Sequence, residues 1–170
     1  MKRYLAFALV LALALTGAAL AAESVVGELE GFPWTLELRA AAAKDGLHTA
    51  AGMQQYDGSV LDVAYDDDPA KGNVFLILTF TITKTQVGGG PFDWANLSVR
   101  DADGNAYARM ENDAFLQNHT YNRIQGTPLQ IGENKGSACF EIPTDAAKGN
   151  LTLVYDAGEF GTIEIPVKPE

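Results

Sequence analysis

The segment Asn73–Thr85 reads NVFLILTFTITKT, and its regular alternation indicates the fold class. The even-numbered residues from 74 to 82 all have large apolar side chains, namely Val74, Leu76, Leu78, Phe80 and Ile82. The odd-numbered residues start with Phe75 and Ile77 and continue with Thr79, Thr81 and Thr83. A period of two places each set on its own face of a β-strand, whereas a helix would scatter both around its axis. The segment therefore predicts a central strand whose apolar face needs a second layer.

Shorter strand signals, separated by turn residues, occupy most of the remaining chain. Alternating or apolar runs mark residues 32–40, 59–65, 92–100, 106–110, 136–142, 151–155 and 162–167. Residues 44–58 and 66–72 are interpreted as loop and turn, and residues 111–128 as polar chain with one short strand near 120–125. Seven to nine short strands predict an all-β fold, an immunoglobulin-like two-sheet antiparallel β-sandwich, with a closed barrel as the alternative.

Four of these stretches together resemble one protein family. They are NVFLILTFTITKT, LSVRDADGNAY, PLQIGENKGSACFEIP and LTLVYD, and the pattern covers roughly residues 29–167. The chain resembles the immunoglobulin-like extracellular domains of unknown function found in bacterial secreted proteins and lipoproteins, and a secreted mycobacterial immunoprotective antigen. The resemblance implies a sandwich located outside the cytoplasm, and it implies no catalytic residue. The segment from residue 48 to residue 68 is longer than the pattern of this family requires.

The first 21 residues have the features of a secretory signal peptide. Lys2 and Arg3 are followed by an apolar run from Leu5 to Leu15, and Ala19-Leu20-Ala21 supplies a cleavage site of small residues. The apolar run is short for a membrane span. No cysteine follows it to carry a lipid anchor. We expect residues 22–170 to form a single domain that is secreted to the extracellular space or the periplasm, with no membrane span.

The charge balance limits the classes of partner. The formal net charge is −10, and loss of Lys2 and Arg3 with the signal peptide takes it to −12. Such a chain repels nucleic acid and anionic lipid, so neither is an expected partner. Cys139 is the only cysteine. The domain therefore has no internal disulfide and depends on its apolar core.

Two acidic stretches are candidates for a calcium site. Asp66, Asp67 and Asp68 are consecutive, and Asp101, Asp103 and Asn105 resemble the start of a calcium loop. An EF-hand needs glycine at its sixth position and glutamate at its twelfth. Here Gly104 is fourth and Asn112 is twelfth, so the spacing does not match. A hairpin turn at Asp103-Gly104 and a solvated loop at 66–68 explain these residues without a metal.

The residues that could support catalysis or ligand binding are few. His48 and His119 are the only histidines, and we interpret both as loop residues rather than zinc ligands. Cys139 lies between Ala138 and Phe140 in an expected strand, where a cysteine is usually buried and inert. No serine has a nucleophile-elbow sequence around it. Trp94 follows a glycine-rich loop and is the candidate ligand-binding aromatic, whereas Trp34 is expected in the core.

These observations favour a secreted, non-enzymatic binding or adhesion module that needs no cofactor. Its expected partner is a protein or glycan at a cell surface, bound through long loops at residues 48–57, 86–92 and 111–118. The first alternative is a calcium-binding or structural extracellular domain. The second is a secreted hydrolase, which would need a cleft holding His119 against a carboxylate or Cys139.

Overall fold

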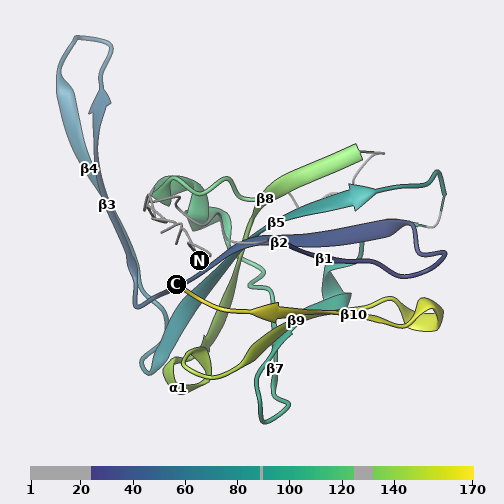
Figure 1. Ribbon diagram of the computed structural model, residues 1–170. Coiled ribbons are helices and arrows are strands. Elements are labelled where there is room, and N and C mark those ends of the chain that lie inside the picture. The colour runs from purple at the N-terminus through teal and green to yellow at the C-terminus, as the bar shows by residue number, and fades with distance from the viewer. Residues whose placement is uncertain (1–23, 89, 125–131) are drawn as a thin grey trace, which may run out of the picture.

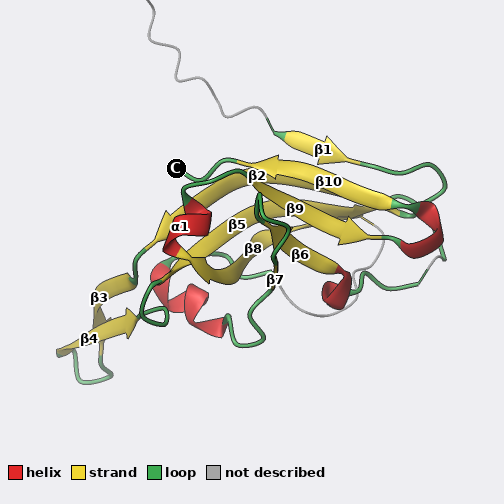
Figure 2. Cartoon of the chain, turned by 90° about the horizontal axis from the view of Figure 1, so that it is seen from below, coloured by secondary structure: helices red, strands yellow, loops and turns green. Residues whose placement is uncertain are grey.

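The computed structural model describes residues 24–88, 90–124 and 132–170, so the expected signal peptide lies outside the described residues. Two four-stranded antiparallel sheets pack face to face, and a two-stranded hairpin projects from one end of them (Figures 1 and 2). The prediction of an all-β sandwich is confirmed. The closed barrel is wrong, because the strands divide into separate sheets.

The first sheet has the order β1-β2-β5-β8. Its strands are β1 (Val25–Gly27), β2 (Trp34–Lys44), β5 (Asn73–Lys84) and β8 (Gly132–Pro143). The second sheet has the order β10-β9-β6-β7. Its strands are β10 (Thr162–Val167), β9 (Leu151–Asp156), β6 (Leu97–Arg100) and β7 (Ala106–Ala108). The predicted central strand is β5, which pairs along its whole length with β8 and along most of it with β2.

The apolar face of β5 lines the core between the two sheets. Leu76 and Leu78 are fully buried there, and the indole of Trp34 is buried as predicted. Residues from the second sheet, such as Leu153 and Ile165, cover this face from the opposite side. A strand that is apolar on one face is stable in water only when a second layer removes that face from solvent.

A smaller apolar cluster covers the outer face of the first sheet. Phe75 and Ile77 project to this side of β5, next to Cys139 on β8. The 3-10 helix η2 (Ala114–His119) supplies Leu116, which is completely buried against them. Phe75 and Ile77, which point away from the core between the sheets, are therefore covered by η2.

The prediction of a loop at residues 44–58 is wrong. Strand β2 continues to Lys44, and β3 (Leu47–Gln54) follows and pairs with β4 (Val60–Asp67) in an unbroken antiparallel register. Asp66 and Asp67 therefore belong to a strand rather than to a turn. The overlooked signal is Asp57-Gly58, a hairpin-turn pair between two strands. Gly58 has a φ of +85°, and Asp57 Oδ1 accepts a hydrogen bond from the Ser59 amide at 2.9 Å.

Two further expectations need correction. The strand expected at residues 92–100 starts only at Leu97, because the 3-10 helix η1 (Trp94–Asn96) precedes it. The Asp93 carboxylate ends the extended chain by accepting a hydrogen bond from the Ala95 amide at 2.9 Å. The strand expected near 120–125 is not formed in its described part, where Arg123 makes only an isolated bridge to Ser137.

Short helical turns complete the described chain. Helix α1 (Thr144–Ala147) follows β8, and the 3-10 helix η3 (Gly158–Phe160) connects β9 to β10. None of the helices in the part of the chain that the structure describes is long and apolar enough to cross a membrane.

Candidate functional site

We call the hairpin formed by β3 and β4, residues 47–67, the arm. It extends away from both sheets of the sandwich, and only its base approaches η2 (Figure 1). The pairing register assigns its side chains to two faces, because directly opposite residues of an antiparallel pair lie on the same face. The apolar face carries Leu47, Thr49, Ala51, Met53, Leu61, Val63 and Tyr65, together with Asp67. The polar face carries His48, Asp62 and Asp66 among small residues and Val60.

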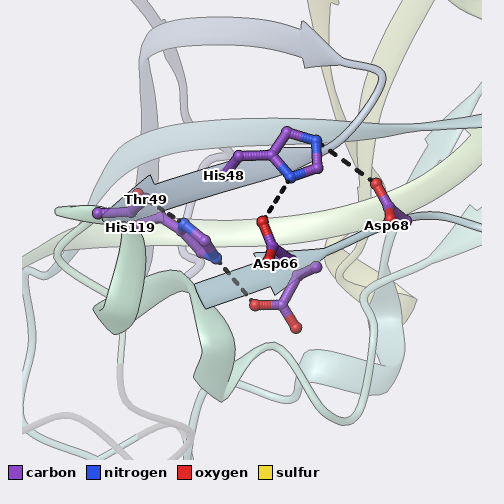
Figure 3. Close-up of polar contacts among 6 residues, drawn as sticks. His48, Thr49, Asp66, Asp68 and His119 are labelled. Carbon is purple, nitrogen blue, oxygen red and sulfur yellow. Dashed lines mark hydrogen bonds and ion pairs between the residues drawn. The ribbon is translucent and has the colours of Figure 1, made fainter. Parts of the chain in front are cut away.

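A chain of hydrogen bonds holds the base of the arm to η2. His119, at the end of η2, places its Nε2 2.8 Å from Asp67 Oδ2 and its Nδ1 2.8 Å from Thr49 Oγ1 (Figure 3). A carboxylate can only accept, so the Nε2–H group of His119 donates to Asp67, and Nδ1 shares the second hydrogen bond with the Thr49 hydroxyl. The His119 side chain is 2% exposed. The interpretation of His119 as a loop residue is therefore wrong, because it is a buried clamp.

The second histidine lies on the opposite face of the arm. His48 Nδ1 is 3.0 Å from Asp66 Oδ1, and its Nε2 is 3.6 Å from Asp68 Oδ1 (Figure 3). All three side chains are more than 60% exposed. Ion pairs at such exposure contribute little to stability, since solvent screens them. His48 therefore lies on the exposed surface of the arm and does not join the arm to the sandwich.

The consecutive carboxylates at 66–68 do not converge on one point. The alternation of β4 turns Asp66 and Asp67 to opposite faces, where each meets a different histidine. No group of three or more histidine, cysteine or acidic side chains among the described residues is arranged to hold a metal ion. Sequence adjacency suggested a cluster, and the strand conformation separates its members.

The second acidic stretch forms the turn between β6 and β7. Asp101 Oδ1 accepts from the amides of Asp103 and Asn105 at 3.0 and 2.9 Å. Its Oδ2 accepts from Asn105 Nδ2 at 2.9 Å and from the Tyr107 hydroxyl at 2.7 Å. These bonds, from Asn105 first and then Tyr107, hold the pKa of Asp101 below its ordinary value. Both oxygens of this carboxylate thus serve the turn itself, as the hairpin interpretation predicts.

The Trp94 side chain is half-buried at the wall of the core. The Arg109 guanidinium lies 4.1 Å from the centre of its ring, and Phe92 meets the indole edge-on at 5.0 Å. Phe80 approaches at 6.2 Å. A cation over a tryptophan face is a favourable contact, and here the protein supplies that cation itself. Binding of a ligand by Trp94 stays a prediction.

The hydroxyl, imidazole and carboxylate of Thr49, His119 and Asp67 have the connectivity of a nucleophile relay. Acyl transfer also needs a cleft and donors aimed at a developing oxyanion. Two cavities found among the described residues lie elsewhere. One, of about 630 Å³, lies between β2 and the C-terminal residues, and the other, of about 320 Å³, lies beside the Asp101 turn. The relay lines neither of these two cavities, and its evident effect is to fix the arm.

Beyond its base, the arm exposes apolar side chains that have no cover among the described residues. Met53 and Leu61 face one another across the strands and are 48% and 54% exposed. Val60 is 64% exposed, and Tyr56 at the tip is fully exposed. Half of the large apolar side chains that are exposed in the described residues are on this one hairpin. Such a concentration marks an interaction surface more often than a neutral one.

Both strands of the arm also present open edges. The hairpin forms a two-stranded sheet of its own, so within the described residues each strand has one backbone edge without a partner strand. Proteins usually protect such edges with lysine, proline, a bulge or a very short strand. Here the strands are eight residues long, their register has no bulge, and neither contains lysine or proline. The edge is therefore suited to pairing.

The single cysteine is buried where β8 meets the outer apolar cluster. Cys139 has no exposed surface, and this burial, with the nearby charges of Asp113 and Glu141, raises the pKa of its thiol to about 12. We expect a thiol reagent to label it slowly in the native protein. Because the unfolded thiol ionises near its ordinary value of 9.0, the unfolded state loses its proton first.

The stability contributed by Cys139 is thus complete below pH 9 and is lost as the pH rises from about 9 towards 12. Urea unfolding at several pH values should show a steeper alkaline loss for the natural protein than for Cys139→Ala. Equal slopes, or rapid native labelling, would contradict the burial. Tyrosines also titrate in this range, which is why the comparison is made between two proteins that share them.

Comparisons with known proteins give a likeness of fold without a family. No family model and no curated protein matches the chain at a significant level. It is similar to a conserved hypothetical protein of Bacillus anthracis, with a TM-score of 0.45, 14% identity, and coverage of 82% of this chain and 96% of that one. It is also similar to ycdA of Bacillus subtilis, described as a putative lipoprotein, with a TM-score of 0.49 and 13% identity. That match covers 85% of this chain, which spans 39% of the other. Neither likeness carries an argument about function.

Proposed function

We propose that this protein is an extracellular, non-enzymatic binding module that engages a partner protein through the arm. The observation that carries the proposal is the apolar face of the arm, which is covered by η2 at the base and open at Met53 and Leu61. The sandwich has a buried core of its own, so the arm is not needed to close it. Only Leu47, at the base of the arm, joins a buried cluster, so the projecting part of the arm is best explained by what it contacts.

The physical cost of such an arm supports the same proposal. An isolated two-stranded hairpin is marginally stable in water, and three strands or packing against another element are needed for independent stability. The clamp of His119, Thr49 and Asp67 steadies only the base. A partner that covers Met53, Leu61 and Val63 would remove the remaining apolar surface from water. The long segment expected to contact a partner at 48–57 falls on this same hairpin.

The proposal is tested by capture from a secreted or cell-surface protein fraction with two matched variants. Met53→Ser with Leu61→Ser removes the exposed apolar pair, whereas Val26→Ser changes a side chain that is 55% exposed on β1, outside the arm. We expect the first variant to lose the captured protein and the second to retain it, with both melting temperatures within a few degrees of the natural protein. Capture that both variants retain would contradict a role for the arm, as would binding only to glycans.

A hydrolase panel tests the enzymatic alternative on the same samples. Thr49→Val keeps the shape of the side chain and removes the hydroxyl that contacts His119. No turnover is expected from either protein. Turnover by the natural protein that disappears in Thr49→Val, with an unchanged melting curve, would overturn the non-enzymatic proposal and make the relay an active site.

A further inference from the structure

Strand β4 has side chains of opposite character on its two faces. Leu61, Val63 and Tyr65 point to the apolar face of the arm, and Asp62 and Asp66 point to the polar face with Ala64 between them. Residues directly opposite in neighbouring strands interact across the pair, so a strand added beside β4 would meet an alternation of apolar and acidic neighbours. Its best complement alternates apolar side chains with lysine or arginine.

We propose that the outer edge of β4 accepts a strand of a partner protein in which apolar residues alternate with lysine or arginine. This inference rests on the proposed function and specifies its partner. Main-chain hydrogen bonds to the open edge supply the pairing, as in β-strand addition to an exposed sheet edge. The apolar residues of the added strand extend the face of Leu61 and Val63, while its cationic residues lie beside Asp62 and Asp66.

The composition of the two strands favours β4 over β3 as the accepting edge. Between Leu47 and Gln54, β3 contains no carboxylate, and Gly52 weakens its strand preference. The sequence of β4, VLDVAYDD, has β-branched and aromatic residues together with three aspartates. The Asp62 side chain is exposed and has no hydrogen-bond or ion-pair partner among the described residues, so its charge is available to an incoming cation.

Charge also distinguishes a basic partner from a second copy of this chain. Residues 45–70 contain six aspartates and no lysine or arginine, and the whole chain is acidic. Pairing two arms would bring charges of one sign together, which opposes association. A cationic strand would instead be attracted to this region, and its binding would weaken as salt screens the charges.

The experiment uses three synthetic ten-residue peptides and the protein labelled with nitrogen-15. In the first peptide valine or tyrosine alternates with lysine. The second carries glutamate in place of lysine, and the third is the lysine peptide with alternate backbone amides methylated, which removes hydrogen bonds along one edge. We expect binding of the first peptide alone. Its addition should shift and protect from exchange the amides of Val60–Tyr65, and its affinity should fall with ionic strength.

Two matched variants identify the charge involved. Asp62→Asn should weaken the lysine peptide about 1.4- to 5-fold, the range expected for loss of one cross-strand charge pair. Asp145→Asn, whose carboxylate is 96% exposed on α1, should leave the affinity unchanged. Equal effects of the two variants would indicate general attraction to an acidic protein and would overturn the assignment to β4.

The remaining outcomes separate this inference from the proposed function. If no peptide binds, or if the methylated peptide binds as well as its parent, strand addition at β4 is overturned. If capture of the partner still depends on Met53 and Leu61, the proposed function stands without strand addition at β4. Dimerisation of the protein itself, measured by light scattering and abolished by Met53→Ser with Leu61→Ser, would assign the apolar face of the arm to a second copy and overturn the basic partner.

Discussion

Replacing Asp113 with alanine is expected to lower the free energy of unfolding by about 3–5 kcal/mol. The Asp113 carboxylate is completely buried and bonds two arginines, accepting from Arg109 Nε at 2.8 Å and from Arg123 Nε. The Arg109 side chain is 7% exposed, so loss of its carboxylate leaves a buried charge without a counter-ion. Removing one member of a buried pair costs more than the pair itself contributes.

Chemical denaturation of Asp113→Ala and Asp145→Ala provides the measurement and its control. The Asp145 carboxylate bonds Lys148 at 3.0 Å but is almost fully exposed, so its loss should change stability by no more than about 0.5 kcal/mol. A loss for Asp113→Ala as small as that of the control would show that the buried triad is not stabilising. Replacing Arg109 and Asp113 together with leucine should cost less than Asp113→Ala, because no unpaired charge then remains from that pair.

Replacing Phe80 with alanine is expected to cost about 3–5 kcal/mol through the cavity that it leaves in the core. Phe80 is 1% exposed on the central strand, with Leu38 and Gly136 opposite it on the two neighbouring strands. Neighbouring backbone limits collapse at this site. A Cβ added at Gly136 would lie 2.7 Å from the Asn122 carbonyl oxygen and from the Ile124 amide nitrogen.

The matched control is Phe160→Ala. Phe160 is 41% exposed and meets Phe32 with ring centres 5.5 Å apart, so removing it should cost about 1 kcal/mol. Both variants are compared by urea unfolding. If Phe80→Ala lost no more stability than Phe160→Ala, Asn73–Thr85 would not form the centre of the core.

The parts of the fold that depend on local periodicity could be predicted from the residues alone. The regular alternation of residues 74–83 sufficed to predict a buried central strand, and β10 begins and ends where Thr162–Val167 were predicted to do so. Burial of Trp34 and Cys139 followed from their positions among apolar neighbours. Such predictions succeed because one covered face leaves a period of two in the residues themselves.

The arm was missed because its alternation is weak. Small residues such as Ala50, Ala51 and Gly52 occupy β3, and an element with one face open to solvent need not show a fully apolar set. The Asp57-Gly58 pair was a local signal that could have revealed the hairpin. The relation between the two strands became evident only through pairing between Leu47–Gln54 and Val60–Asp67.

Which polar residues meet depends on tertiary packing alone. Thr49, Asp67 and His119 are separated by 18 and 52 positions along the chain, and no spacing rule connects them before η2 packs on the base of the arm. Asp113 likewise joins Arg109 and Arg123 because the chain folds back between them. Contacts between side chains distant in sequence depend on how elements pack, whereas strand periodicity depends on neighbouring residues alone. The candidate interaction surface also depends on tertiary packing, because it arises from projection of the arm beyond the sandwich.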